Sequence, residues 1–157
     1  MKISVLDLQS KIKISPKEIK RAIRKTLSSK GRPYSGEINV VFTDDRQIRE
    51  LNLMYLGRDS STDVISFDNS SGKWGLLADI VVSTETAVRQ SRIFKTAPIY
   101  EVYLYVIHGV LHLLGYDDNT ARKRKLMQKK AESILSPILN TQYSKNVHPQ
   151  NRSHSLK

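Results

Sequence analysis

The chain has 157 residues, of which 26 are Lys or Arg and 15 are Asp or Glu, so its formal net charge is +11. It contains no cysteine, which excludes disulfide scaffolds, cysteine-ligated zinc, iron–sulfur clusters and thiol catalysis. This length supports a single domain, and the basic balance favours a polyanionic partner.

The first half of the chain predicts strands that alternate with helices. Ser15 is a favourable N-cap, and Pro16 suits the first position of a helix. Caps for a second helix are offered by Thr43, Asp44 and Asp45. In chain order the pattern predicts a strand at 2–6, a helix at 16–27, a strand at 37–42, a helix from 45 to about 55, and strands at 63–67 and 76–82. We expect Asp79 to interrupt the last of these strands.

The second half predicts helices. Thr84 is the expected cap of a helix that ends near Phe94, and Pro98 opens a helix that stops at Gly115. A last helix is expected over 120–135. Strands grouped early and helices grouped late indicate an α+β fold, with a single small mixed β-sheet covered by helices.

The domain organisation follows from the same pattern. We expect one catalytic-type domain over residues 1–139 and a loose basic C-terminal tail over 140–157, which has no acidic residue and few apolar ones. Charge interrupts the N-terminus too early for a signal peptide, and the longest apolar stretch, 102–114, is too short to span a bilayer. The expected location is therefore the cytoplasm, with no membrane partner. The oligomeric state stays open.

Two histidines on one predicted helix form a candidate metal site. His108 and His112 are four residues apart, so their side chains share a helix face and both imidazoles can reach a single cation. Gly115 allows the chain to turn back, which makes Asp118 a candidate third ligand and leaves a fourth position for water. The alternative is two polar residues tolerated in a core helix, but buried imidazoles need partners. His148 and His154 lie in the predicted tail and are expected to be inert.

The spacing of this segment also matches part of the metzincin protease pattern, H-E-x-x-H-x-x-G-x-x-H. Those enzymes place a glutamate general base directly after the first histidine, and here that position is Gly109. Protease chemistry is therefore disfavoured, and a hydrolase that activates water at a metal in another way is preferred.

Three segments resemble one known family. The run from His108 to Asp117, HGVLHLLGYD, is similar to the signature HGxLHLxGYDH of the YbeY endoribonucleases, the rRNA maturation factors. Upstream, LNLMY at 51–55 with STDVISF at 61–67 resembles LNxxYR…PTDVLSF, and LADIVVS at 77–83 resembles GDIVIS. The match covers about residues 39–132, in order and at similar spacing.

The resemblance implies a small α+β fold around a histidine-ligated divalent metal, with zinc the expected ion. It also implies a single-strand endoribonuclease that acts near the 3′ end of small-subunit rRNA and in ribosome quality control. The expected partners are ribosomal RNA and the small ribosomal subunit.

Three positions depart from the family pattern. Asp118 stands at the third histidine, so the expected site has two imidazoles and one carboxylate. Leu56 stands at the arginine, and Arg58, two residues later, is the candidate that neutralises charge on the phosphate. Ala78 replaces a glycine. No general base is identified among the acidic residues of the matched motifs.

Other expected site residues flank the metal. Asp117 either orients a metal ligand from the second shell or caps the last helix. Basic residues crowd the start of that helix, where the dipole disfavours them, which indicates RNA-phosphate binding by Arg122, Lys123, Arg124 and Lys125. A second basic face on the helix at 16–27 is either a solvated surface or a further phosphate contact.

The sequence leaves two rival functions open. One is a non-catalytic RNA- or ribosome-binding factor with a structural metal, which a closed four-ligand site would support. The other is a metal-dependent hydrolase of another substrate class, against which Gly109 and the net charge of +11 argue.

Overall fold

The structure, a computed structural model, describes residues 1–72 and 75–139. In chain order its elements are β1 (Lys2–Asp7), α1 (Pro16–Ser28), β2 (Gly36–Thr43), α2 (Asp45–Leu56), β3 (Val64–Asp68), β4 (Leu76–Ser83), α3 (Thr84–Phe94), α4 (Pro98–Leu113) and α5 (Ala121–Leu135). The predicted tail at 140–157, with His148 and His154, lies outside the described residues. Among the described residues, no helix is long and apolar enough to cross a membrane.

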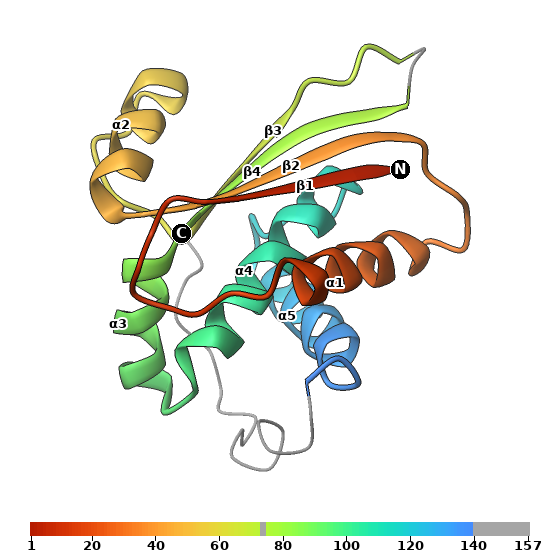
Figure 1. Ribbon diagram of the computed structural model, residues 1–157. Helices are drawn as coiled ribbons and strands as arrows, with labels where there is room; N and C mark the ends of the chain where they lie inside the picture. The colour runs from red at the N-terminus through yellow and green to blue at the C-terminus, as the bar shows by residue number, and fades with distance from the viewer. Residues whose placement is uncertain (73–74, 140–157) are drawn as a thin grey trace.

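The strands form one mixed sheet in the order β1-β2-β4-β3, which is visible edge to edge in Figure 1. The three strands β1, β2 and β4 are parallel, and β3 runs antiparallel to β4. A parallel pair needs a crossover connection, and α1 supplies it between β1 and β2. The prediction of an α+β fold with one small mixed sheet is confirmed.

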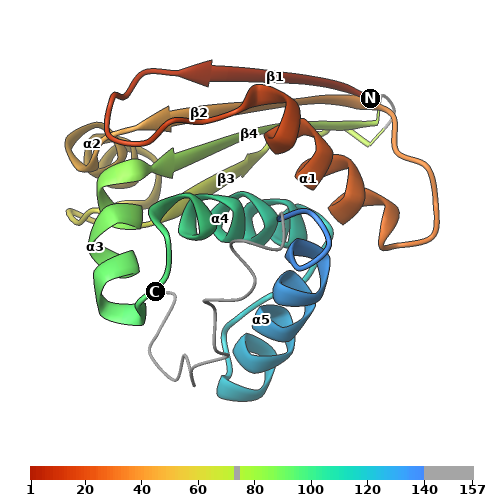
Figure 2. The same cartoon turned by 60° about the horizontal axis from the view of Figure 1, so that its bottom comes forward.

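Helices cover the two faces of the sheet unequally. The main core lies between the sheet and a layer that contains α1, α3, α4 and α5, as Figure 2 shows. On the other face, the described part of the chain forms a small cluster in which Ile48 of α2 packs on Ile65 of β3 and Val81 of β4. Most of the apolar burial, and with it most of the stabilisation of the fold, is therefore on the α4 side.

The helix α4 occupies the centre of the main layer. Pro98 stands at its start, where a missing N–H costs nothing, and every residue from Tyr100 to Leu111 is buried. Its neighbours are α1, α3, α5 and strands β3 and β4. A helix buried on all sides is held rigidly, so side chains in its last turns are placed with little freedom.

Local capping agrees with the sequence in most places. The side chain of Ser15 caps α1 as predicted, and Asp44, one of three predicted candidates, caps α2. The cap of α5 is Thr120, which was expected to be the first residue of that helix. The cap of α3 is Ser83 and not Thr84, because the Ser83 hydroxyl accepts from the backbone N–H of Thr86 while Thr84 is already helical.

The predicted interruption of the strand at Asp79 is wrong. The strand β4 runs through this residue without a break and pairs on both sides. The Asp79 carboxylate accepts hydrogen bonds of 3.0 Å from Asn39 of β2 and of 3.0 Å from Asn69 after β3. A polar residue is tolerated there because its side chain is satisfied across the strands.

Candidate metal and RNA site

The last turns of α4 present the two predicted histidines. His108 is 2% exposed, whereas the His112 side chain is 35% exposed, so the second imidazole stands at the protein surface. After α4 ends, Gly115 adopts φ 92°, a left-handed conformation that glycine accepts without strain. The turn directs residues 115–118, here called the ligand loop, back toward the histidines.

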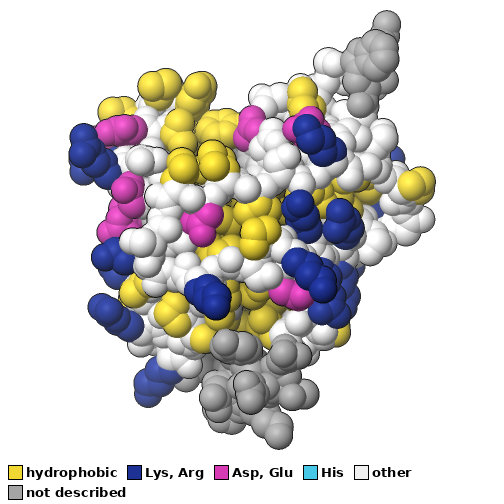
Figure 3. Space-filling view, in the orientation of Figure 1, with side chains coloured by type: hydrophobic (Ala, Val, Ile, Leu, Met, Phe, Trp, Pro, Cys, Tyr) yellow, Lys and Arg dark blue, Asp and Glu magenta, His cyan; other side chains and the backbone are white. Residues whose placement is uncertain are grey.

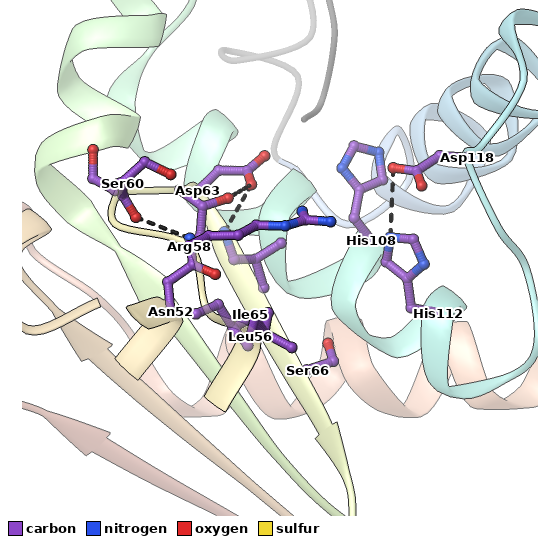
Figure 4. Close-up of a pocket in the computed structure, with 13 residues that line it drawn as sticks. Asn52, Leu56, Arg58, Ser60, Asp63, Ile65, Ser66, His108, His112 and Asp118 are labelled. Carbon is purple, nitrogen blue, oxygen red and sulfur yellow. Dashed lines mark hydrogen bonds and ion pairs between the residues drawn. The ribbon is translucent and has the colours of Figure 1, made fainter. Parts of the chain in front are cut away.

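The ligand loop brings Asp118 to the face of α4 that carries the histidines. Its Oδ2 lies 3.7 Å from Nε2 of His112. A dashed line marks this pair in Figure 4. His108, His112 and Asp118 all line one pocket. Within residues 1–72 and 75–139, however, no three His, Asp or Glu side chains already stand in a metal-binding arrangement. Convergence of all three on one metal position therefore stays a prediction.

The tautomer of His112 is set by a backbone carbonyl. Its Nδ1 lies 3.1 Å from the carbonyl oxygen of Tyr116, and a carbonyl only accepts, so Nδ1 carries the hydrogen. The neutral ring then presents a lone pair at Nε2, toward the Asp118 carboxylate. This is the orientation of metal-binding histidines, whose other ring nitrogen donates to a carbonyl or carboxylate.

The His112–Asp118 pair fits a shared divalent cation. The separation of 3.7 Å is longer than a normal N–H···O hydrogen bond. Two ligands at ~2.1 Å from one tetrahedral zinc stand about 3.4 Å apart, close to the separation found. Two lone-pair atoms that face each other at this distance are stabilised by a cation between them, so the donor set suits the ion that the sequence predicts.

The first residues of α5 hold the ligand loop. Arg124 Nη1 donates to the carbonyl of Asp118 at 3.1 Å, and Lys123 Nζ lies 3.1 Å from the Asp117 carboxylate. Asp117 was expected to orient a ligand or to cap α5. The cap is Thr120, the His112 ring is oriented by the Tyr116 carbonyl, and Asp117 pairs with Lys123. Two of the four predicted RNA-binding residues thus also fix the loop that carries Asp118.

The pocket has a volume of about 680 Å³ and is open to solvent on one side. Arg58 enters it from the turn after α2, where Gly57 ends the helix at φ 67°, and its side chain extends toward His108 in Figure 4. An arginine at this place supplies positive charge opposite the histidines, and its action on the charge of a phosphate stays a prediction.

Asp63 lines the same pocket, and its carboxyl has an unusually high pKa. Its Oδ1 accepts from the backbone N–H of Val64 at 2.8 Å and from the Thr62 hydroxyl at 3.1 Å. Burial, and to a smaller extent the negative charge of Asp118, nevertheless raise the pKa of the Asp63 carboxyl to about 6. A carboxyl with this pKa can hold or release a proton near neutral pH, which is the property expected of a general acid or base.

The stability of the metal-free protein should depend on Asp63 between about pH 4 and pH 6. In this window the unfolded chain releases the proton while the folded chain retains it, so raising the pH favours unfolding. One unit of pKa shift corresponds to ~1.4 kcal/mol, so the free energy of unfolding falls by at most about 3 kcal/mol across this window. Asp63→Asn keeps an oxygen acceptor and removes the titration. Chemical denaturation of both proteins with a chelator across this range should give diverging curves, and parallel curves would contradict the assignment.

Gly109 explains why this helix carries no glutamate after its first histidine. A Cβ at this position would lie 2.9 Å from Oγ of Ser66 and 3.0 Å from Cγ2 of Ile80. The Ser66 hydroxyl also donates to the Gly109 carbonyl at 3.0 Å, which ties α4 to β3. A side chain at 109 would collide with β3 and β4, so a glutamate has no room at this position and the metzincin base has no counterpart here.

Gly109→Ala should destabilise the protein despite the better helix propensity of alanine. The added methyl forces Ser66 and Ile80 to move, at a cost of about 1–3 kcal/mol against a propensity gain of ~1 kcal/mol. Thermal denaturation should show a lower Tm. The double variant Gly109→Ala with Ser66→Ala removes the nearest clash and should recover part of the loss, whereas an unchanged Tm in the single variant would contradict the close packing.

The sequence did not separate catalytic from structural roles in the upstream motifs. The structure brings Asn52, Asp63 and Ser66 to the pocket, while Asp79 lies within the sheet. Asn52 is buried and its amide donates to the carbonyl of Ser60 at 2.9 Å, which fixes the turn that carries Arg58. In the sequence these residues stand out as polar side chains inside apolar motifs. The sequence does not indicate which way each side chain points.

Known proteins match most of this chain in sequence. A family model described as Endoribonuclease YbeY matches residues 4–139. The protein named Endoribonuclease YbeY from Desulforamulus reducens is 37% identical over 149 residues, covering 88% of this chain and 97% of the relative. The protein of the same name from Christiangramia forsetii is 39% identical over 114 residues, covering 73% of this chain and 78% of the relative.

A solved structure shares the fold. The solution structure of TM1509 from Thermotoga maritima matches with a TM-score of 0.59 and 24% identity, over 96% of this chain and 99% of that one. At this level of identity the likeness concerns the arrangement of the helices and the sheet. It supports the α+β architecture described above.

Proposed function

Because the chain belongs to the YbeY endoribonuclease family, we propose that it is a metal-dependent endoribonuclease that cuts single-stranded RNA. Its substrate would be ribosomal RNA near the 3′ end of the small-subunit rRNA, with a second role in ribosome quality control. Both roles place it in the cytoplasm with the small ribosomal subunit as its partner.

One observation supports the metal site above the others. His112 is fixed by the Tyr116 carbonyl with its Nε2 lone pair toward the Asp118 carboxylate, at the edge of an open pocket. A structural metal site is closed by four protein ligands, whereas a catalytic one keeps a position for water or substrate. The openness of the pocket favours the catalyst over the rival, a non-catalytic RNA- or ribosome-binding factor.

The side chains of the pocket have separable tasks. A bound divalent ion, zinc by the chemistry of the donors, would polarise a phosphoryl oxygen and acidify water. His108, His112 and Asp118 would hold it. Arg58 would neutralise the charge that develops on the phosphate, and the Asp63 carboxyl would take up or supply a proton during phosphodiester cleavage.

The basic start of α5 would hold the RNA backbone beside this pocket. Arg122 and Lys125 are exposed, whereas Arg124 is half-buried against the ligand loop. Arg122 and Lys125 are therefore assigned to phosphate contacts, and Lys123 and Arg124 contribute both charge and support for the loop.

Removal of the metal tests the proposal. Protein dialysed against a chelator should lose cleavage of a single-stranded RNA and regain it when zinc or manganese is added back. Metal analysis of the untreated protein and far-UV circular dichroism of the stripped protein separate loss of the ion from loss of the fold. Full cleavage in the folded, stripped protein would contradict metal dependence, and absence of cleavage under every metal would favour the non-catalytic factor.

A further inference from the structure

The positive charge of the chain is concentrated outside the segment that builds the pocket. Residues 36–118, which include the pocket-lining residues, hold seven Lys and Arg against twelve Asp and Glu. Residues 8–35, centred on α1, hold nine Lys and Arg against one Glu. An RNA strand that enters the pocket therefore meets a net acidic part of the chain, and its main electrostatic attraction must come from elsewhere.

The helix α1 presents its positive charge to solvent. Ile19, Ala22 and Ile23 are fully buried in the main core, which fixes the opposite side of the helix toward solvent. On that side lie five cations, here called the α1 basic face, and Figure 3 shows Lys and Arg side chains gathered over α1. The face consists of Lys17, Lys20, Arg21, Arg24 and Lys25.

The spacing of the face suits a regular line of phosphates. Lys17, Arg21 and Arg24 are exposed and lie four and three residues apart, so they form one stripe about 10 Å long on a rigid helix. Glu18 is the acid of this helix and pairs with Arg21 at 3.4 Å. The stripe therefore remains positively charged even when the Glu18–Arg21 ion pair is taken as neutral.

The residues of α1 favour a double helix over a single strand. Proteins that bind single strands combine positive charge with aromatic side chains on which bases stack, and α1 contains no aromatic residue. Duplex RNA is bound mainly through its phosphates and sugars, which a row of cations can contact. A membrane surface is disfavoured, because the apolar side of α1 is buried in the core and cannot insert.

The α1 basic face also leads toward the pocket. Two residues beyond the end of α1, Lys30 Nζ lies 4.5 Å from the centre of the Tyr116 ring, in the ligand loop. One end of the basic helix therefore reaches the segment that carries Asp118. A nucleic acid held along α1 is thereby anchored close to the loop that helps to form the site.

We infer that the α1 basic face docks the sugar–phosphate backbone of an RNA double helix that flanks the single strand received by the pocket. The inference rests on the proposed function in taking RNA as the ligand. It assigns affinity for the flanking duplex to α1, whereas the single strand is held at the start of α5 and cleaved in the pocket, so duplex binding and cleavage can be measured separately.

The test compares two variants of equal charge. Lys17→Ala with Arg24→Ala removes two exposed cations from the α1 basic face, and Arg92→Ala with Lys95→Asn removes two exposed cations from α3 and its C-cap. Asparagine suits position 95 because Lys95 has φ 55°. Both proteins and the wild type are titrated by fluorescence anisotropy against a blunt RNA hairpin and a short unstructured single strand, from ~50 to ~200 mM salt.

The α1 variant should lose affinity for the hairpin by roughly tenfold or more, and its log–log salt slope should fall by about 1.8, or ~0.9 for each lost phosphate contact. Its binding and cleavage of the short single strand should match those of the wild type, and the α3 variant should match the wild type throughout. If the wild type cleaves no RNA while the hairpin result holds, the proposed activity fails and this inference stands.

Three results would overturn the inference. An unchanged salt slope for the hairpin shows a solvated face without phosphate contacts. Equal losses in the α1 and α3 variants show that only the net charge matters. If the α1 variant loses binding to anionic phospholipid vesicles but still binds the hairpin as the wild type does, the α1 basic face binds a membrane surface.

Discussion

Replacing His112 with alanine should remove both the bound metal and RNA cleavage. This imidazole is the one whose Nδ1 is held by the Tyr116 carbonyl and whose Nε2 faces the Asp118 carboxylate. Loss of a group that merely orients a ligand costs about 10–100-fold in metal affinity or activity, so loss of the ligand itself should cost at least ~100-fold. Metal analysis by mass spectrometry and a cleavage assay on the same preparation measure the two effects together.

The chain offers a matched control for this experiment. His154→Ala removes a histidine that is predicted to be inert, and it should leave metal content and cleavage unchanged. The His112 side chain is 35% exposed, so its removal should lower the free energy of unfolding only slightly. A folded His112→Ala protein that retains metal and cuts RNA at the wild-type rate would exclude His112 from the site.

Replacing Asp118 with histidine should change the choice of metal and the pH dependence of cleavage. Zinc with two imidazoles and a carboxylate carries a formal charge of about +1, and with three imidazoles about +2. A more positive site promotes loss of a proton from water, so the activity–pH profile should move to lower pH. An imidazole in place of a hard oxygen ligand should also strengthen zinc relative to manganese.

The measurement requires both metals and both proteins at the same salt concentration. Competition titrations of wild type and Asp118→His with zinc and manganese give the ratio of affinities, and initial rates across the pH range give the profile. Asp118→Asn serves as a control, because it keeps the size and removes the charge. If Asp118→His alters neither the metal ranking nor the profile, Asp118 is not a ligand, and its distance of 3.7 Å from His112 has another origin.

Much of the fold could be predicted because its signals are local. Helix starts at Pro16 and Pro98, the cap at Asp44 and the apolar strands each depend on neighbouring residues, and the structure has them as expected. The histidine pair could be predicted equally well, because residues four apart on a helix share a face.

The remaining features depend on contacts between distant segments. The hydrogen bond from Arg124 to the Asp118 carbonyl depends on how α5 returns, and the satisfied carboxylate of Asp79 depends on Asn39 from another strand. The raised pKa of Asp63 arises from burial in the folded protein and from the charge of Asp118, which is distant in the chain. Composition and periodicity carry no information on these distances. The sequence therefore predicts that Asp117 orients a metal ligand or caps α5, whereas the Tyr116 carbonyl orients the His112 ring and Thr120 is the cap.

The topology of the sheet has a consequence for how the molecule forms. Ile3 pairs with Ile38 and Val40 pairs with Ile80, so each parallel pair must close a long loop, whereas β3 and β4 lie close together in the chain. Contacts between residues far apart in sequence slow folding, because the entropy of loop closure is lost before the contacts form. The antiparallel pair is therefore the part of the sheet best suited to form first. Although β2 is synthesised before this pair, it can join the sheet only once β4, about 40 residues later in the chain, has been made. The histidines follow later still, on a helix whose burial requires the completed sheet.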